Sequence, residues 1–213
     1  MAGQQLALTV LMGLVLVGVA TLLTRIEDWR RYTALAGGAV AVGEESGYGH
    51  REKPSGLFRW LTTVDHKDIG ILYGVFALAS LAIGGIMVLV MRLELLTPAS
   101  DMVSPQFYNA LLTSHGITML FLFGTPIIAA FGNYFVPLLI GADDMAFPRI
   151  NAIAFWLLPP GALLIWGGFL IPGIAPSQTS WTMYTPLSVE QAHLGADLML
   201  LGLHLTGVSA TMG

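Results

Sequence analysis

His115 is the residue whose position most directly suggests chemistry. It is the only titratable side chain in the apolar stretch 111–131, and an ionisable group inside a membrane helix is costly enough to mark a functional site. A neutral imidazole can offer one ring nitrogen to a metal while an acceptor holds the other. Gly116 follows it and is expected to leave open surface beside the ring, where a flat ligand could approach. On pattern alone, a ligand histidine and a hydrogen-bonded structural histidine are equally supported.

Further polar residues stand at the ends of the apolar segments around His115. The guanidinium of Arg92 could bind a carboxylate or carbonyl of a ligand, or it could extend to the membrane interface. The loop sequence NYFVPLLIGADDMAFPRIN gathers Asn133, Asp143, Asp144, Arg149 and Asn151. Carboxylates and amides there could collect protons through hydrogen-bonded water, or they could form an ordinary solvated loop with a helix cap.

The elements that must position these residues are predicted to be membrane-spanning helices. The chain is 55% apolar and 10% charged, with a mean hydropathy of +0.73, which excludes an ordinary soluble domain. A helix needs about 20 residues to cross a membrane, and five segments meet this requirement: 6–23, 69–91, 110–131, 152–171 and 193–213. The absence of cysteine excludes thiolate metal sites, so histidine, carboxylate or a prosthetic group must hold any metal.

The distribution of positive charge predicts how these helices cross the membrane. Seven of the nine Lys and Arg residues lie between the first two segments, and Arg149 follows the third. The positive-inside rule puts both loops in the cytoplasm and the N-terminus outside. His115 is then expected near the outer face in nearly the same layer as Arg92, with Asn133 about 27 Å further in. Residues 37–57 are rich in Gly, Ser and Glu and are predicted to be a flexible cytoplasmic linker.

The other histidines and the aromatic residues of the last loop carry weaker signals. His66 is expected at the cytoplasmic interface, and His204 to make a structural hydrogen bond inside the membrane. His193 is expected to be solvated at the outer boundary. Trp181 fits an interfacial aromatic belt. No patch of basic residues suitable for binding nucleic acid is present.

Six segments together resemble subunit I of the haem–copper terminal oxidases of the cytochrome c oxidase type. They are WLTTVDHKDIGILYG at 60–74, RLEL at 92–95, YNALLTSHGITMLF at 108–121, GNYFVPLLIGADDMAFPRIN at 132–151, FWLLPPG at 155–161 and LHLTGVSATMG at 203–213. The resemblance implies an all-α integral membrane protein, a bundle of about five transmembrane helices from a core of roughly twelve. Residues 57–213 would form the first four core helices, and residues 1–56 an extension with one additional helix and the linker.

The resemblance also implies a role for individual residues. His115 matches an axial ligand of the low-spin haem, Arg92 an arginine that hydrogen-bonds that haem, and Trp181 a tryptophan near the haem propionates. Asp144 matches the mouth of a proton channel, which Asn133, Asn151 and Ser209 would line, and Glu94 matches an outer cation site of some members. Two positions depart from the family pattern, because Asp143 stands where many members have proline and Ala210 where many have a second serine.

The function implied is part of the catalytic subunit of a respiratory oxidase that reduces O2 to water with electrons from cytochrome c or a similar donor, coupled to proton translocation. The low-spin haem is expected to be haem a, while the ligands of the high-spin haem and copper lie outside this chain, as do all catalytic residues. Partners would be oxidase subunits II and III and membrane lipid, in a prokaryotic cell membrane. The 213-residue chain alone is predicted to be inactive.

Two alternatives remain open. One is a quinol-oxidising member of the superfamily, and the other is a truncated, non-enzymatic haem-binding or assembly module. The DNA sequence downstream of this chain would discriminate the module from the oxidase.

Overall fold

The computed structural model describes residues 56–98 and 102–213, with scattered positions between residues 10 and 25. The predicted first span, 6–23, and most of the linker, 37–57, fall outside the described residues. Within the described ranges the chain is helical and contains no strand. In chain order the elements are α2 (Leu57–Thr62), α3 (His66–Glu94), α4 (Pro105–Ile117), the π-helix η1 (Thr118–Gly124), α5 (Thr125–Ile140), α6 (Pro148–Ile165), α7 (Gly167–Leu170), α8 (Leu187–Glu190) and α9 (Leu194–Met212).

Among the described residues, four helices are long and apolar enough to cross a membrane: His66–Glu94, Pro105–Ile140, Pro148–Ile165 and Leu194–Met212. The predicted spans 69–91 and 193–213 correspond closely to α3 and α9. The span predicted at 110–131 belongs to a longer helix, made of α4, η1 and α5. These helices confirm the prediction of an all-helical membrane fold.

The span predicted at 152–171 is too long, because α6 ends at Ile165 and only the short α7 follows it. A Cβ at Gly168 would overlap the backbone of Pro176. The loop after α7 therefore crosses directly over this glycine.

Side-chain caps fix where two of the long helices begin. Asp65 accepts hydrogen bonds from the backbone N–H groups of Lys67 and Asp68 at the start of α3. Ser104 accepts from the N–H of Phe107, and Pro105 occupies the first turn of α4. Such caps satisfy N–H groups that have no partner within the helix.

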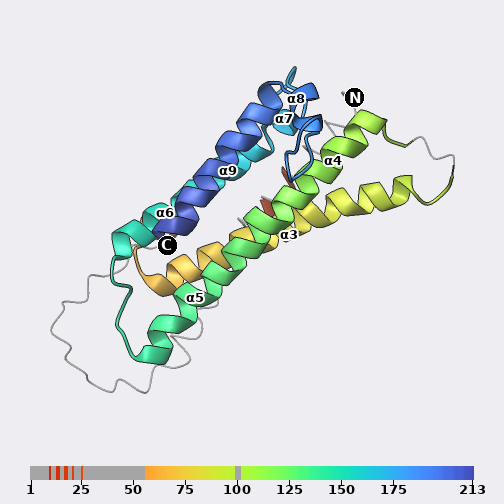
Figure 1. Ribbon diagram of the computed structural model, residues 1–213. Coiled ribbons are helices and arrows are strands. Elements are labelled where there is room, and N and C mark those ends of the chain that lie inside the picture. Colours follow the sequence, from red (N-terminus) through yellow and green to blue (C-terminus); the bar gives the residue numbers. More distant parts are fainter. Residues whose placement is uncertain are drawn as a thin grey trace.

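The long helices pack as two pairs (Figure 1), with α9 against α6 and α3 against the continuous helix formed by α4, η1 and α5. The backbones of α6 and α9 approach closely where Gly161 and Gly202 meet, since a Cβ on Gly202 would lie 2.5 Å from the Gly161 carbonyl oxygen. In the second pair, Gly70 of α3 packs against Tyr134 and Ala130 of α5. Small residues at such contacts allow membrane helices to pack without a hydrophobic driving force.

Candidate functional site

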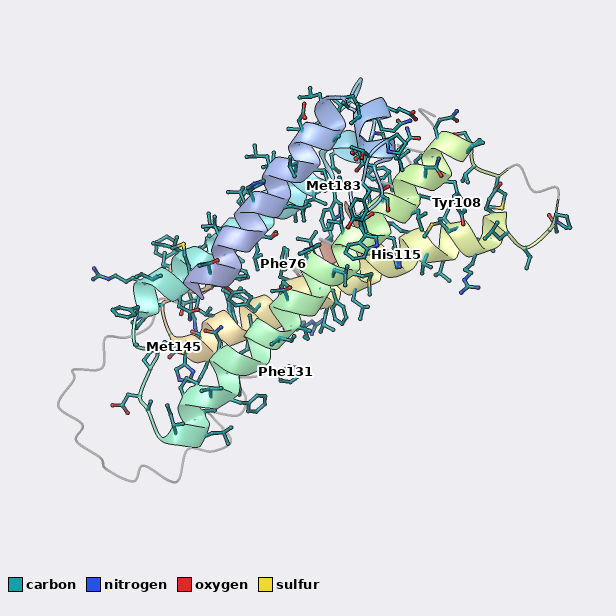
Figure 2. The ribbon with its side chains drawn as sticks, in the orientation of Figure 1. Phe76, Tyr108, His115, Phe131, Met145 and Met183 are labelled. Carbon is teal, nitrogen blue, oxygen red and sulfur yellow. The ribbon has the colours of Figure 1, made fainter. Side chains whose placement is uncertain are left out.

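His115 lies in the last turn of α4, where α4 crosses α3 (Figure 2). Its Nδ1 is 2.9 Å from the carbonyl oxygen of Gly84 on α3. A carbonyl can only accept a hydrogen bond, so Nδ1 carries the proton and Nε2 keeps its lone pair. Nε2 makes no hydrogen bond to any described residue. The ring is therefore held in the tautomer and orientation that a metal-ligating imidazole requires.

The surface beside His115 is covered, and not open as the sequence suggested. A Cβ on Gly116 would lie 3.2–3.4 Å from three side-chain atoms of Trp181. The Trp181 side chain packs directly on the glycine backbone and is itself 49% exposed. The structure thus brings together two of the predicted haem-site residues, His115 and Trp181, from helix α4 and the loop before α8.

The helix carrying His115 widens into the π-helix η1 directly after the turn that holds this histidine. Thr118, the first residue of η1, accepts a 3.0 Å hydrogen bond from the indole Nε1 of Trp166. Met119 packs against Gly84, where a Cβ would lie 2.7 Å from its sulfur. Single π turns are rare and occur often at functional sites. No pattern in the sequence predicted this π-helix.

Arg92 and Glu94 end α3, but neither lies level with His115. Arg92 is exposed and stands eight residues beyond Gly84, which is about 12 Å along the helix. The prediction that Arg92 and His115 share one layer is therefore wrong, because the imidazole lies deeper, beside Gly84. Glu94 is half-buried, and its carboxylate accepts a 3.0 Å hydrogen bond from the backbone N–H of Val103, which closes the α3–α4 connection.

At the opposite end of the bundle, Asn133 and Asn151 form a buried amide pair. Asn151 donates from Nδ2 to Oδ1 of Asn133 at 2.6 Å, and Asn133 donates to the Ala129 carbonyl. Their side chains are 4% and 3% exposed. The Oδ1 atom of Asn151 is buried and has no partner among the described residues, so it remains able to accept a hydrogen bond.

His66, the first residue of α3, belongs to this buried cluster. The ring is 1% exposed, and Nδ1 lies 2.8 Å from the backbone carbonyl of Asn133. The HKDIG motif therefore joins the start of α3 to α5 through a buried hydrogen bond.

The acidic pair of the inner loop consists of two carboxylates in different surroundings. Asp144 is half-buried, and its Oδ1 accepts a 2.7 Å hydrogen bond from the N–H of Met145. Asp143 and Arg149 are exposed. Among the described residues, no hydrogen bond joins Asp144 to the amide pair.

Ser209 lines a partly open cavity of about 210 Å³ bordered by α3, η1, α5, α6 and α9. Its hydroxyl donates to the carbonyl of Ala154 at 2.7 Å and lies beside the Tyr73 hydroxyl. Thr206, one turn earlier on α9, also lines the cavity, as does Ala210. Sequence reasoning missed Tyr73 and Thr206; the one-turn spacing of Thr206 from Ser209 was the available signal.

Two further histidines, His204 and His193, make local hydrogen bonds. Nδ1 of His204 lies 2.8 Å from the Leu200 carbonyl, which is the structural hydrogen bond expected of it. His193, which was expected to be solvated, is half-buried and caps α9 through its Nδ1, so it is only partly in contact with solvent. No group of three or more His, Cys, Asp or Glu side chains that could hold a metal ion occurs in the part of the chain the structure describes.

Comparison with known proteins identifies the family. A family model described as cytochrome c and quinol oxidase polypeptide I matches residues 68–213. The chain is 68% identical over 212 residues to a cytochrome c oxidase polypeptide 1 of Halobacterium salinarum, a match covering 100% of the chain and 36% of that protein. It is 49% identical over 150 residues to a cytochrome c oxidase subunit 1 of Synechocystis, covering 70% of the chain and 27% of that protein.

A third relative, a cytochrome c oxidase subunit 1 of Corynebacterium efficiens, is 42% identical over 175 residues, covering 81% of the chain and 30% of that protein. The chain therefore spans about a third of the length of the curated relatives it matches. The family model covers more than half of the chain, including His115, the amide pair and Ser209. The chain belongs to the family of cytochrome c and quinol oxidase polypeptide I.

Proposed function

We propose that this chain is part of the catalytic subunit of a respiratory terminal oxidase, which reduces O2 to water with electrons from cytochrome c or a similar small donor and couples this to proton translocation. The observation that carries the proposal is the His115 ring, held through Nδ1 by the Gly84 carbonyl so that Nε2 is available to a metal. Family membership supports the same reaction class. The relatives named above are called cytochrome c oxidases, which favours that donor over quinol.

The residues at the outer end fit a low-spin haem. His115 would supply one axial nitrogen, and a haem bound there would act as a one-electron carrier. A buried carbonyl on the second ring nitrogen raises the basicity of a ligating imidazole and fixes its plane. Trp181 would border the haem propionates and Arg92 another peripheral group. The second axial ligand, the high-spin haem and copper would be held by the remaining part of the longer subunit, and the low-spin haem would be haem a.

The residues at the inner end fit a route for protons. Asp144 would receive protons at the cytoplasmic loop, and the buried amide pair would orient water, since Asn151 Oδ1 can still accept a hydrogen bond. The cavity at Ser209 adds the hydroxyls of Tyr73 and Thr206. Hydroxyl groups both donate and accept hydrogen bonds, and so they can pass a proton along a water chain. The missing hydroxyl at Ala210 leaves one wall of this cavity without a donor.

The remaining proposals concern the assembly. The subunit would lie in a prokaryotic cell membrane with its N-terminus outside, assembled with oxidase subunits II and III and surrounded by lipid. Residues 1–56 would be an extension containing one additional helix, and residues 57–213 would be the first part of the oxidase core. The 213-residue chain by itself would be inactive, because further haem and copper ligands are required. Glu94 would contribute to an outer cation site only if its bond to Val103 were released.

The test is the spectrum of the longer subunit carrying His115→Ala, assembled with its partners. We expect the low-spin haem band to disappear from the reduced-minus-oxidised spectrum. His204→Ala is the matched control, because that imidazole also lies within a membrane helix but bonds its own backbone. An unchanged band in His115→Ala would overturn the ligand assignment, and equal loss in both variants would indicate failed assembly.

A further inference from the structure

The loop that carries Trp181 is attached to the His115 helix through one buried hydroxyl. Thr113 lies two residues before His115 and is 1% exposed. Its Oγ1 donates to the Asn109 carbonyl at 2.9 Å and accepts from the backbone N–H of Ser180 at 3.1 Å. This hydrogen bond spans 67 residues of sequence and reaches the residue directly before Trp181.

The backbone on both sides of Trp181 is held in a conformation that few residues adopt without support. Ser180 has φ 62° and Met183 has φ 53°, both in the left-handed region although neither is glycine. Such a conformation persists where surrounding contacts determine it. Met183 packs against the buried core that includes Phe107, and the Thr113 hydroxyl holds Ser180. These two attachments flank the indole.

Hydrogen bonds within the loop extend the same attachment. The Ser177 and Thr179 hydroxyls are 3.0 Å apart, and Thr179 donates to the Ser180 carbonyl. Because the Thr179 hydrogen is used in that bond, Ser177 donates to Thr179. Ser177 and Thr179 are 4% and 3% exposed, so the network is shielded from water.

Thr113 and Gly116 are three residues apart and therefore share one face of α4. The hydroxyl fixes the loop backbone on this face, and the glycine leaves the gap into which the indole packs at 3.2–3.4 Å from the position of a Cβ. The adjacent face of the same turn carries the His115 ring toward Gly84. Helix α4 thus sets the position of Trp181 relative to His115.

We infer that Thr113 is a positioning residue for the low-spin haem environment, acting through Trp181. This inference rests on the proposed function, in which His115 ligates that haem. The Thr113 side chain makes no hydrogen bond to the His115 imidazole. Its effect on the haem requires the indole as the intermediary, and this requirement makes the inference testable.

The experiment measures the midpoint potential of the low-spin haem in the assembled oxidase. Thr113→Val keeps the shape but removes the hydroxyl, and Thr113→Ser keeps the hydroxyl. We expect a shifted potential in Thr113→Val and the parental potential in Thr113→Ser. In a Trp181→Phe background, Thr113→Val should cause a smaller shift than in the parental protein, because the indole that transmits the effect is gone.

Each outcome bears on a separate claim. An unshifted potential in Thr113→Val would overturn the inference, and so would an equal shift in both backgrounds, which would show that Thr113 acts without Trp181. If Thr113→Val lowers haem content, Gly116→Ala provides a second test, because the added methyl group displaces the same indole while the Thr113 hydroxyl stays intact. We expect Gly116→Ala to shift the potential, and an unshifted potential would also overturn the inference. The proposed function fails separately, through a retained low-spin band in His115→Ala.

Discussion

At one end the bundle holds one imidazole ring in a fixed orientation, whereas at the opposite end it holds a series of amides and hydroxyls. His115 has one partner, the Gly84 carbonyl, and its other nitrogen makes no hydrogen bond to a described residue. Asn151 is bonded to Asn133 and retains one unpaired buried oxygen. An imidazole in a fixed orientation is suited to bind a metal permanently. A buried oxygen that can still accept a hydrogen bond is suited to bind water that exchanges during turnover. This contrast supports the proposal of electron chemistry at one end and proton chemistry at the other.

The largest effect is expected where both ends share a support, at the crossing of α6 and α9. Gly202→Ala would place a Cβ 2.5 Å from the Gly161 carbonyl and 2.9 Å from the Ile165 nitrogen. Backbone atoms cannot rotate away, so we expect the free energy of unfolding to fall by about 3 kcal/mol. Denaturation in detergent, followed by circular dichroism, measures this change.

The matched control for Gly202 is another glycine of α9. Gly207 has open space at the position of its Cβ, so Gly207→Ala should stabilise α9 by up to about 1 kcal/mol through helix propensity. Equal effects of the two substitutions would show that α6 and α9 do not meet at Gly202, and that the two ends lack this common support.

A smaller effect, confined to the inner end, is expected from Asn151→Leu. The change removes the only donor to Asn133 Oδ1 that the structure contains among its described residues, and it leaves a buried acceptor unpaired. We expect a loss of about 2 kcal/mol in stability and slower proton uptake, with the low-spin haem spectrum unchanged. Asn109→Leu, at an exposed asparagine, should affect neither. A changed haem spectrum in Asn151→Leu would contradict the separation of the two ends.

Asp144→Asn tests the entry of protons. Losing a positioned carboxylate should slow proton uptake from the cytoplasmic side by about tenfold, equivalent to about 1.4 kcal/mol of barrier. Haem content should stay at the parental level. Asp143→Asn is the control, because Asp143 is exposed whereas Asp144 is half-buried. Proton uptake is measured for both variants in reconstituted vesicles. Uptake at the parental rate in Asp144→Asn would show that this carboxylate is not on the proton route.

The smallest effect is expected at Ser209. Ser209→Ala removes a buried 2.7 Å hydrogen bond to Ala154 and should lower stability by about 1 kcal/mol. Ser80→Ala is its control, since the Ser80 hydroxyl is buried without a partner in the described chain, and its removal should be neutral or slightly stabilising. A neutral Ser209→Ala would mean that water already satisfies this hydroxyl and the Ala154 carbonyl.

The sequence predicted the elements of the fold better than their ends. Apolar length located α3 and α9 closely, because spanning a membrane sets both length and composition. The helix beginning at Pro105 extends past the predicted span, since the Ser104 cap lies before its apolar part and Pro137 near its end does not break it. The loop that crosses over Gly168, just beyond the end of α6, makes a tertiary contact that apolar length does not predict.

The sequence identified the residues of the candidate site but did not predict how they are arranged in space. His115 stands out because a titratable group within apolar sequence is costly. Its tautomer depends on the Gly84 carbonyl, 31 residues away in the chain. The packing of Trp181 on Gly116 and the π-helix likewise follow from contacts between distant segments, and no local pattern encodes them.

The most direct measurement of the central claim is chemical rescue of the ligand position. In the assembled oxidase, His115→Gly removes the ring and leaves space for an exogenous imidazole. We expect the low-spin haem band to be lost in His115→Gly and restored when imidazole is added, while His204→Gly keeps the band throughout. A low-spin band in His115→Gly equal to that of the parental protein, without imidazole, would show that His115 is not the haem ligand.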